Sequence, residues 1–246
     1  MDKSFPRFYR RDILVLAAAT ATLCVLPLAD AFAQGAAAKP KIGMIGSGNV
    51  GSNLGRAWVR AGYEVMFSSK DIEADRKLAA DIGGKARAGT PQEAGAFGEV
   101  LVFAVPYGAQ PELGKTLGKS LNGKVVIDAS NPFPQRDGEI ATEAREKGAG
   151  IVSARLLPGA RIVRAFNAIP AARMSVGHEA PGKVGVPIAG DDAKAIEVAS
   201  RMIRDIGFEP VLVGGAAMGK HLVPGTPLAG EHAPAEVRTI AATLKP

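Results

Sequence analysis

Three glycines with the spacing GxGxxG form the pattern in this 246-residue sequence whose chemistry is easiest to name. Gly46, Gly48 and Gly51 follow a short apolar run at 42–45 and precede apolar residues at helical spacing. In that context the first glycine permits a tight turn and the second lets a pyrophosphate approach the backbone. The third lets the helix pack closely on the strand. The free N–H groups and the dipole at the helix start attract an anion. The pattern predicts a dinucleotide site; the alternative is a glycine-rich turn without a ligand.

The residues after the second expected strand indicate which dinucleotide binds. That strand covers residues 63–67, and Ser68, Ser69 and Lys70 follow it. Units that bind NAD often place a carboxylate about 20 residues beyond the glycines, where it holds the ribose hydroxyls. A carboxylate would repel a 2′-phosphate, whereas hydroxyls and an ammonium would bind it. The sequence therefore favours NADP; the alternative is a polar strand end with a solvated lysine.

Further apolar runs alternate with helical stretches. Residues 100–105 form a continuous apolar run, as expected for a strand buried on both faces of a parallel sheet, and 125–128 repeat this pattern; residues 161–166 give the next strand. Helices are expected between them, at 109–121 and 140–157. Strands that alternate with helices form an open sheet whose ligands bind at the carboxyl ends of the strands. We therefore predict an α/β fold of the Rossmann type: a doubly wound, mostly parallel sheet with helices on both faces.

The carboxyl ends of these strands should converge on one crevice. The candidate cofactor-binding residues at these ends are Val105, Pro106, Tyr107, Ser130, Asn131 and Asn167, and those of the first two turns are Gly46, Ser47, Gly48, Asn49, Val50, Ser68, Ser69 and Lys70. Asp128 ends a strand before Ser-Asn-Pro and is typical of a turn former rather than a base. Glu93 belongs to a capping box that begins at Thr90. We therefore assign no catalytic side chain, and the scattered histidines lack metal-ligand spacing.

The first 34 residues have the layout of a secretory signal peptide. Arg7, Arg10 and Arg11 precede the apolar run 13–29, and an A-x-A site follows at 31–33. The adjacent arginines resemble a twin-arginine signal, which exports folded proteins. We expect a periplasmic or otherwise exported protein; the general secretory route and an uncleaved membrane anchor are the alternatives. The expected divisions are a signal at 1–34, a linker at 35–40, a nucleotide-binding domain at 41–228 and a tail or helix at 229–246.

Charge and cysteine content limit the kinds of partner. The net charge of +6 falls to +5 without the signal, which carries four basic and three acidic residues, and no dense basic run points to nucleic acid. Cys24 is the single cysteine and lies in the signal, so the mature chain would have no disulfide and no cysteine metal site. We expect no stable membrane span in the mature chain. The sequence does not fix the oligomeric state, and a homodimer is one state that it allows.

Several stretches, in this order, carry a family resemblance. They are IGMIGSGNVGSNLGRAW, LVFAVPYGA, VVIDASNPF, RIVRAFNAIPAARM, VPIAGDDAKA and IRDIGFEPVLVGG. From about Lys41 to Leu228 the chain resembles NADPH-dependent reductases of the deazaflavin coenzyme F420. It is also similar to the cytoplasmic reductase domain of six-transmembrane metalloreductases. The resemblance implies an NADP(H) cofactor, with Ser47–Val50 at the pyrophosphate and Ser69 and Lys70 at the 2′-phosphate. It also implies a strand end at 105–107 under the nicotinamide ribose and a segment at 166–168, including Ala168, near the reacting ring.

The expected activity is hydride exchange between NADPH and a flavin or deazaflavin acceptor, a small molecule whose reduction could serve metal reduction. Such transfer needs stacking and orientation, and the cofactors carry the chemistry. Reductases of carbonyl substrates with similar glycine turns add a large helical domain, and the 33 residues after Val213 are too few for one. The expectation includes no cytochrome-like membrane helices after the domain. The alternative function is an exported NADP-binding sensor or partner protein without turnover, because a free NADPH pool is not expected outside the cytoplasm.

Overall fold

The first strand, β1 (Ile42–Ile45), lies inside an eight-stranded sheet in the described part of the chain, in the order β3-β2-β1-β4-β5-β6-β7-β8. The other strands are β2 (Val65–Ser68), β3 (Ala86–Ala88), β4 (Val100–Phe103), β5 (Val125–Asp128), β6 (Arg161–Arg164), β7 (Gly185–Gly190) and β8 (Glu209–Gly214). Strands β1 to β6 are parallel. β7 is antiparallel to β6, and β8 is parallel to β7. The sheet is the predicted doubly wound, mostly parallel type.

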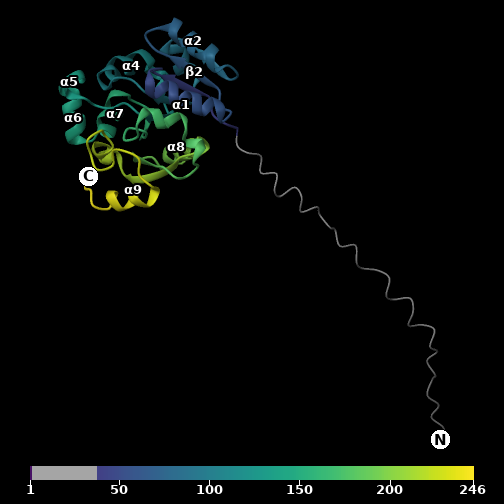
Figure 1. Cartoon of the computed structure of the whole chain (residues 1–246), viewed down its shortest axis with the longest axis vertical. Helices are drawn as coiled ribbons and strands as arrows, with labels where there is room; N and C mark the ends of the chain where they lie inside the picture. Colours follow the sequence, from purple (N-terminus) through teal and green to yellow (C-terminus); the bar gives the residue numbers. More distant parts are fainter. Residues whose placement is uncertain (2–37) are drawn as a thin grey trace. The chain divides into compact units, whose positions relative to one another are not determined.

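The computed structural model describes Met1 and residues 38–246, and residues 39–246 form one unit (Figure 1). Residues 2–37, which hold nearly all of the expected signal and much of the linker, lie outside the described residues. No helix in the described part is long and apolar enough to cross a membrane.

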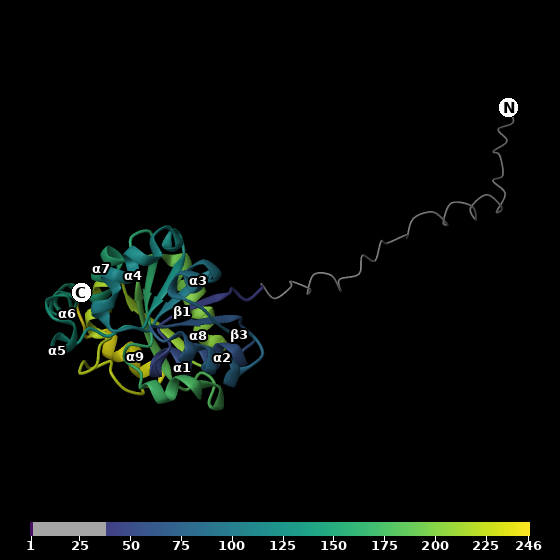
Figure 2. The same cartoon turned by 90° about the horizontal axis from the view of Figure 1, so that it is seen from above.

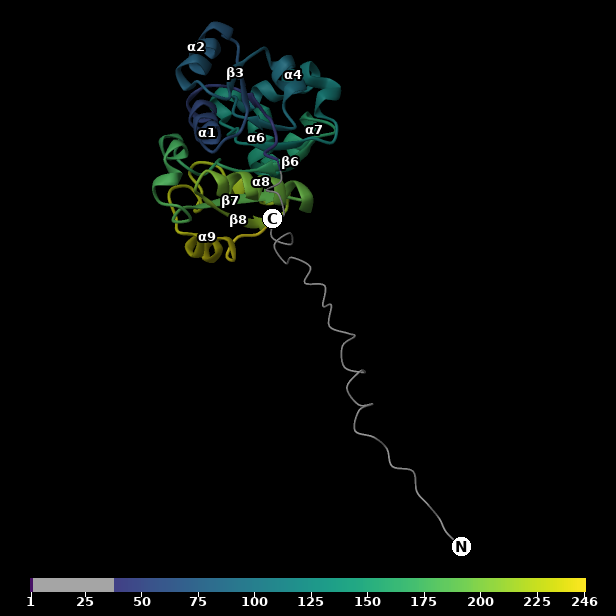
Figure 3. The ribbon, with the colours of Figure 1, turned by 90° about the vertical axis from the view of Figure 1, so that its right-hand side faces the viewer.

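Helices lie on both faces of the sheet. They are α1 (Asn49–Arg60), α2 (Ile72–Ile82), α3 (Pro91–Phe97), α4 (Gln110–Leu117), α5 (Pro134–Asp137), α6 (Glu139–Lys147), α7 (Ala149–Leu156), α8 (Ala193–Asp205) and α9 (Pro234–Ala241). Short 3-10 helices are η2 (Tyr107–Ala109), η3 (Gly118–Leu121), η4 (Ala171–Ser175), η5 (Gly177–Glu179) and η6 (Ala216–His221). Figure 2 shows α1, α2 and α8 on one side of β1 and α3, α4 and α7 on the other. In Figure 3, β7 and β8 lie between α8 and α9.

The alternation of side chains along the strands separates two apolar layers. Ile42 and Met44 of β1 pack in the layer that contains α1 and α8, whereas Ile45 packs in the layer of α3 and η3. Trp58 joins α1 to α8, because its Nε1 donates to the Met202 carbonyl at 3.0 Å. Its side chain is fully buried, so this contact fixes the helix that follows the glycine turn.

The sequence predictions differ from the structure in three places. The expected helix at 140–157 is two helices, because Gly148 has a φ of 105°, outside the helical region. β3 was missed because three residues reading Ala-Arg-Ala carry no apolar run. The reversal at β7 was also missed, since a run of apolar residues does not encode strand direction. The expected strands at 63–67, 100–105, 125–128 and 161–166 and the expected helix at 109–121 lie where they were expected, to within a few residues.

Candidate functional site

The glycine turn has a different spatial constraint at each glycine. Gly46 has a φ of 99°, and a Cβ added there would lie 2.4 Å from the Ala104 carbonyl oxygen. A Cβ on Gly51 would lie 1.8 Å from the Gly46 oxygen, so only glycine lets α1 pack against the turn. At Gly48 an added Cβ would meet nothing within 4 Å. Gly46 and Gly51 are therefore required by the fold itself, whereas Gly48 leaves open space in front of α1.

The N-terminus of α1 is free to bind an anion. Gly48 is its N-cap, no side chain caps it, and its first turn contains no acidic residue. Asn49 is exposed and Val50 half-buried at this end. The first N–H groups of a helix have no partner within the helix, and its dipole is positive there. These two observations fit the pyrophosphate of a dinucleotide, with Ser47, Gly48, Asn49 and Val50 around it.

At the end of β2 the structure differs from the prediction, because the Ser68 and Ser69 hydroxyls donate to groups of the protein. Ser68 is fully buried and its hydroxyl donates to the Met44 carbonyl at 2.8 Å, so this side chain holds β2 to β1. Ser69 is half-buried and its hydroxyl donates to Asp75 at 2.8 Å. Lys70 is exposed, and within the described part no carboxylate pairs with it. Of the three residues predicted to hold the 2′-phosphate, Ser68 thus has its hydroxyl committed to the interior.

Asp75 is a residue that sequence reasoning missed. It lies in the first turn of α2, is fully buried and accepts hydrogen bonds from both Ser47 and Ser69. It therefore links the turn after β1 to the turn after β2. The signal that could have found it is a carboxylate in the first turn of the helix that follows the ribose-binding position.

The end of β4 carries a tyrosine that points inward. Val105 is half-buried and Pro106 exposed, but Tyr107 is fully buried. Its hydroxyl donates to the Ala149 carbonyl at 2.8 Å and lies 3.0 Å from the Ser153 hydroxyl oxygen. Burial raises the pKa of Tyr107 well above its ordinary value, with the nearby Asp128 acting in the same direction. The predicted cofactor contact at this strand end can therefore involve the backbone but not the Tyr107 ring.

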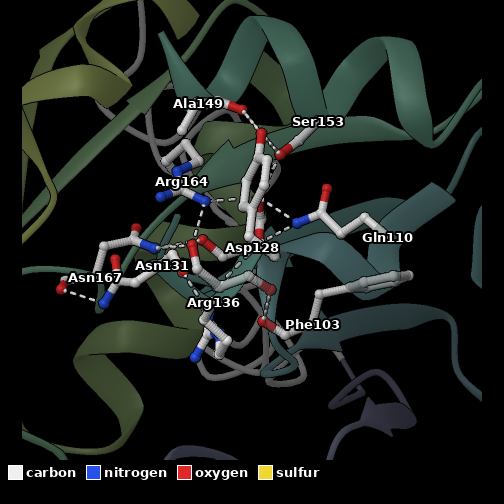
Figure 4. A network of polar contacts seen from close by, with 11 residues as sticks. Phe103, Gln110, Asp128, Asn131, Arg136, Ala149, Ser153, Arg164 and Asn167 are labelled. Carbon is white, nitrogen blue, oxygen red and sulfur yellow. Dashed lines mark hydrogen bonds and ion pairs between the residues drawn. The ribbon is translucent and has the colours of Figure 1, made fainter. Parts of the chain in front are cut away.

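A buried ionic network holds the ends of β5 and β6 together (Figure 4). The carboxylate of Asp128 accepts hydrogen bonds from Arg164 and Ser153, each at 2.7 Å, and from Gln110 at 3.2 Å. Asp128 and Arg164 are both fully buried. Arg164 also donates to the Ser130 carbonyl at 2.7 Å, which holds the turn after β5 in place. Asp128 is therefore part of the support beneath the site, which agrees with its not being assigned as a base.

Two asparagines that line a cavity are held by hydrogen bonds to backbone carbonyls. The amide nitrogen of Asn167 donates to the Asp128 and Ser130 carbonyls at 3.1 and 3.2 Å, and that of Asn131 donates to the Asn167 carbonyl at 2.9 Å. Because these partners are carbonyls, each nitrogen must face them and each Oδ1 must face elsewhere. Both Oδ1 atoms are buried without a hydrogen-bond partner among the described residues.

The cavity has a volume of about 430 Å³. Its lining comes from the start of α1, from the ends of β5 and β6 and from the C-terminal segment: Val50, Asn131, Phe166, Asn167, Ala168, Ile169, Pro170, Ala171, Met174, Pro224, Gly225, Ala229 and Gly230. No residue of this lining carries a charge. The C-terminal segment is held in place where the Gly230 N–H donates to the Ala168 carbonyl at 2.8 Å.

Phe166 gives this cavity a constrained backbone. It is the one non-glycine residue of the described chain with a positive φ, at 67°. Its ring makes edge-to-face contacts with Trp58 and Phe208, with centroids 6.0 Å away in each case. A left-handed conformation at a bulky residue costs about 1–3 kcal/mol and persists where the surroundings impose it, often at functional sites. The aromatic contacts hold Phe166 so that Asn167 and Ala168 face the cavity.

Comparison with known proteins agrees with this geometry. Residues 41–132 match the family described as coenzyme F420-dependent NADP oxidoreductases. The F420-dependent NADP reductase of Methanothermobacter thermautotrophicus is 31% identical over 202 residues, which cover 76% of this chain and 87% of that protein. The chain belongs to the F420-dependent NADP reductase family. It is thereby a member of a family of NADP-dependent oxidoreductases.

Two further likenesses extend this assignment. The metalloreductase STEAP3 of Rattus norvegicus is 30% identical over 183 residues, 74% of this chain, and the chain spans about a third of its length (36%). A solved structure of a hypothetical protein, SMa0349 from Sinorhizobium meliloti, has a TM-score of 0.66 and 26% identity. That match covers 77% of this chain and 92% of the other. The fold and the family are thus those predicted from the sequence motifs.

His221 and His232 are not among the residues that line the cavity. His221 contacts the Lys245 carbonyl oxygen through Nε2 at 2.7 Å, and His232 pairs with Glu236 at 3.0 Å. The described residues contain no group of three or more His, Cys, Asp or Glu side chains that could hold a metal ion. The site offers helix N–H groups and one lysine, which are groups for binding and orienting a ligand.

Proposed function

We propose that the protein exchanges a hydride between NADP(H) and a flavin or deazaflavin acceptor. The observation that carries the proposal is the open space at Gly48 before the uncapped N-terminus of α1, in a chain of the F420-dependent NADP reductase family. That space lies where a pyrophosphate would meet helix N–H groups. Lys70, exposed at the end of β2, supplies the positive charge for a 2′-phosphate.

The nicotinamide half is assigned to the cavity at the ends of β5 and β6. Asn131 and Asn167 line this cavity, and Phe166 and Ala168 form its apolar wall. When bound, the nicotinamide supplies or receives the hydride. The residues of this chain orient it and exclude water, and no proton donor is needed at the hydride step.

The uncharged lining of the cavity supports an acceptor that places a planar, uncharged ring there. A carboxylate or phosphate substrate would require a partner of opposite charge near the reacting atom, and the lining provides none. A flavin or deazaflavin ring stacks on apolar surface and reacts without a protein acid. Metal reduction by the reduced acceptor is a further use, suggested by the likeness to a metalloreductase.

The sequence of the first 34 residues supports export, by the twin-arginine route, as part of the proposal. Export of the folded chain would allow the nucleotide to bind before translocation. The same leader favours a second candidate function, an exported NADP-binding protein without turnover, because such a protein needs no supply of NADPH outside the cytoplasm.

Absorbance of the reduced nicotinamide distinguishes these functions. Purified protein is mixed with NADPH, then with a free flavin or with coenzyme F420, and the loss of reduced nicotinamide is followed. Oxidation that depends on both protein and acceptor supports the reductase. Calorimetric binding of NADPH without oxidation by either acceptor supports the binding protein, and the absence of binding on folded material contradicts both.

A further inference from the structure

Asp75 is a buried carboxylate without a cationic partner. Its side chain is fully buried, and in the described part of the chain the groups that contact it are the hydroxyls of Ser47 and Ser69. Burying a carboxylate without a cation costs several kcal/mol, which the N-terminal dipole of α2 offsets only in part. An asparagine or a serine would link the two turns at less cost. The carboxylate therefore calls for a reason beyond stability.

The hydroxyls of Ser47 and Ser69 both donate their proton to the Asp75 carboxylate. A serine hydroxyl has one proton to donate, and an ionised carboxylate can only accept. Ser69 lies 2.8 Å from Asp75 but 3.3 Å from the Asp71 carbonyl, so the carboxylate is the better acceptor. Toward a ligand, Ser47 and Ser69 therefore present oxygen lone pairs. Ser69 Oγ already accepts a hydrogen bond from the Asp71 N–H at 3.1 Å, so it has one lone pair left for a ligand. A free ribose hydroxyl can donate to such an oxygen, whereas a dianionic 2′-phosphate has no proton to give.

We propose that Asp75 is a specificity-determining residue of the nucleotide site. By holding the protons of Ser47 and Ser69, it makes their oxygens acceptors that favour a free 2′-hydroxyl. It thereby opposes the preference for a 2′-phosphate that Lys70 creates. This inference rests on the proposed function, in which the adenosine half of the nucleotide lies between these two turns. The wild-type protein then discriminates less between NADP and NAD than Lys70 alone would make it.

Fragments of the nucleotide isolate this effect from hydride chemistry. The affinities of the full chain for 2′,5′-ADP and for 5′-AMP are measured by calorimetry in the wild type and in Asp75→Asn. The asparagine amide donates to one serine oxygen, so that serine's proton becomes free for the phosphate. We expect the ratio of the two affinities to shift about tenfold toward 2′,5′-ADP, as for one added charge-assisted hydrogen bond.

Two further variants separate the hydroxyl protons from net charge. Asp81→Asn makes the same change of charge at an exposed position of α2, and it should leave the ratio within about twofold of wild type because exposed charges are screened. In Asp75→Asn combined with Ser47→Ala and Ser69→Ala, the shift should disappear, because whichever hydroxyl the asparagine frees is absent. Persistence of the full shift in this triple variant would overturn the proposal.

The remaining outcomes of these titrations also test the proposal. If Asp75→Asn changes both affinities equally, Asp75 is merely structural and the proposal is overturned alone. If the wild type binds neither fragment nor either dinucleotide, the proposed function fails together with it. Should Asp75→Asn not fold, Ser69→Ala in the wild type gives the answer: a larger loss for 5′-AMP than for 2′,5′-ADP supports acceptor serines, and the opposite order refutes them.

Discussion

Gly48→Val tests whether the open space at the glycine turn is a phosphate site. An added Cβ at Gly48 meets nothing within 4 Å, and its φ of −65° suits any L-residue. We therefore expect the free energy of unfolding to change by no more than about 1 kcal/mol. The valine methyls would occupy the space in front of the first N–H groups of α1. Loss of two charge-assisted hydrogen bonds costs about 3 kcal/mol or more, which is roughly a hundredfold or greater loss of NADP affinity.

The assay combines denaturant unfolding with calorimetric titration of NADP on the same preparation. Gly51→Ala is the contrasting variant, because its Cβ would lie 1.8 Å from the Gly46 oxygen. It should lose stability as well as binding, whereas Gly48→Val should lose binding alone. Unchanged NADP affinity in a folded Gly48→Val protein would refute the placement of the pyrophosphate at this turn.

Other predictions address charge at the site and beneath it. Lys70→Glu should weaken NADPH on the order of tenfold more than NADH, because it sets a carboxylate against the 2′-phosphate; equal losses in parallel titrations would contradict the role of Lys70. Arg164→Met should lower the free energy of unfolding by about 3–5 kcal/mol, because it leaves Asp128 buried without its cation, and a loss under about 1 kcal/mol by denaturant would show the pair to be dispensable. The pKa of Asp192 is lowered, chiefly by the Arg161 guanidinium and then by the Ala195 N–H at the start of α8. Its contribution to the free energy of unfolding is therefore present at neutral pH and is lost as the pH falls below the ordinary Asp value of about 4. Asp192→Asn should flatten the acid limb of the stability profile, and an unaltered limb would be evidence against this pair.

The sequence predicted the parts of the fold that repeat a local pattern. β5 lies at Val125–Asp128, as expected, because a continuous apolar run between polar ends specifies a buried strand. The capping box at Thr90 and Glu93 is present, and those contacts lower the pKa of Glu93. The glycine turn was predictable because its steric requirements are local.

What the sequence could not give were contacts between distant segments. The commitment of the Ser68 hydroxyl to Met44 and of Tyr107 to Ala149 depends on which strand and helix lie beside them. The same holds for Asp75, whose partners are 28 and 6 residues away in sequence. Side-chain direction at a strand end is set by tertiary packing, and no spacing rule encodes it.

Because β7 and β8 are reversed, the two ends of the site are built by different segments of the chain. Those strands run opposite to β6, so their carboxyl ends point away from the carboxyl ends of β1 to β6. The far wall of the cavity is built instead by Pro224, Gly225, Ala229 and Gly230. In the proposed function, the first turns bind the adenosine and pyrophosphate, and this tail segment lies beside the nicotinamide and its redox partner. Exchanging that segment would therefore reshape the nicotinamide end of the proposed site while the adenosine end stays unchanged.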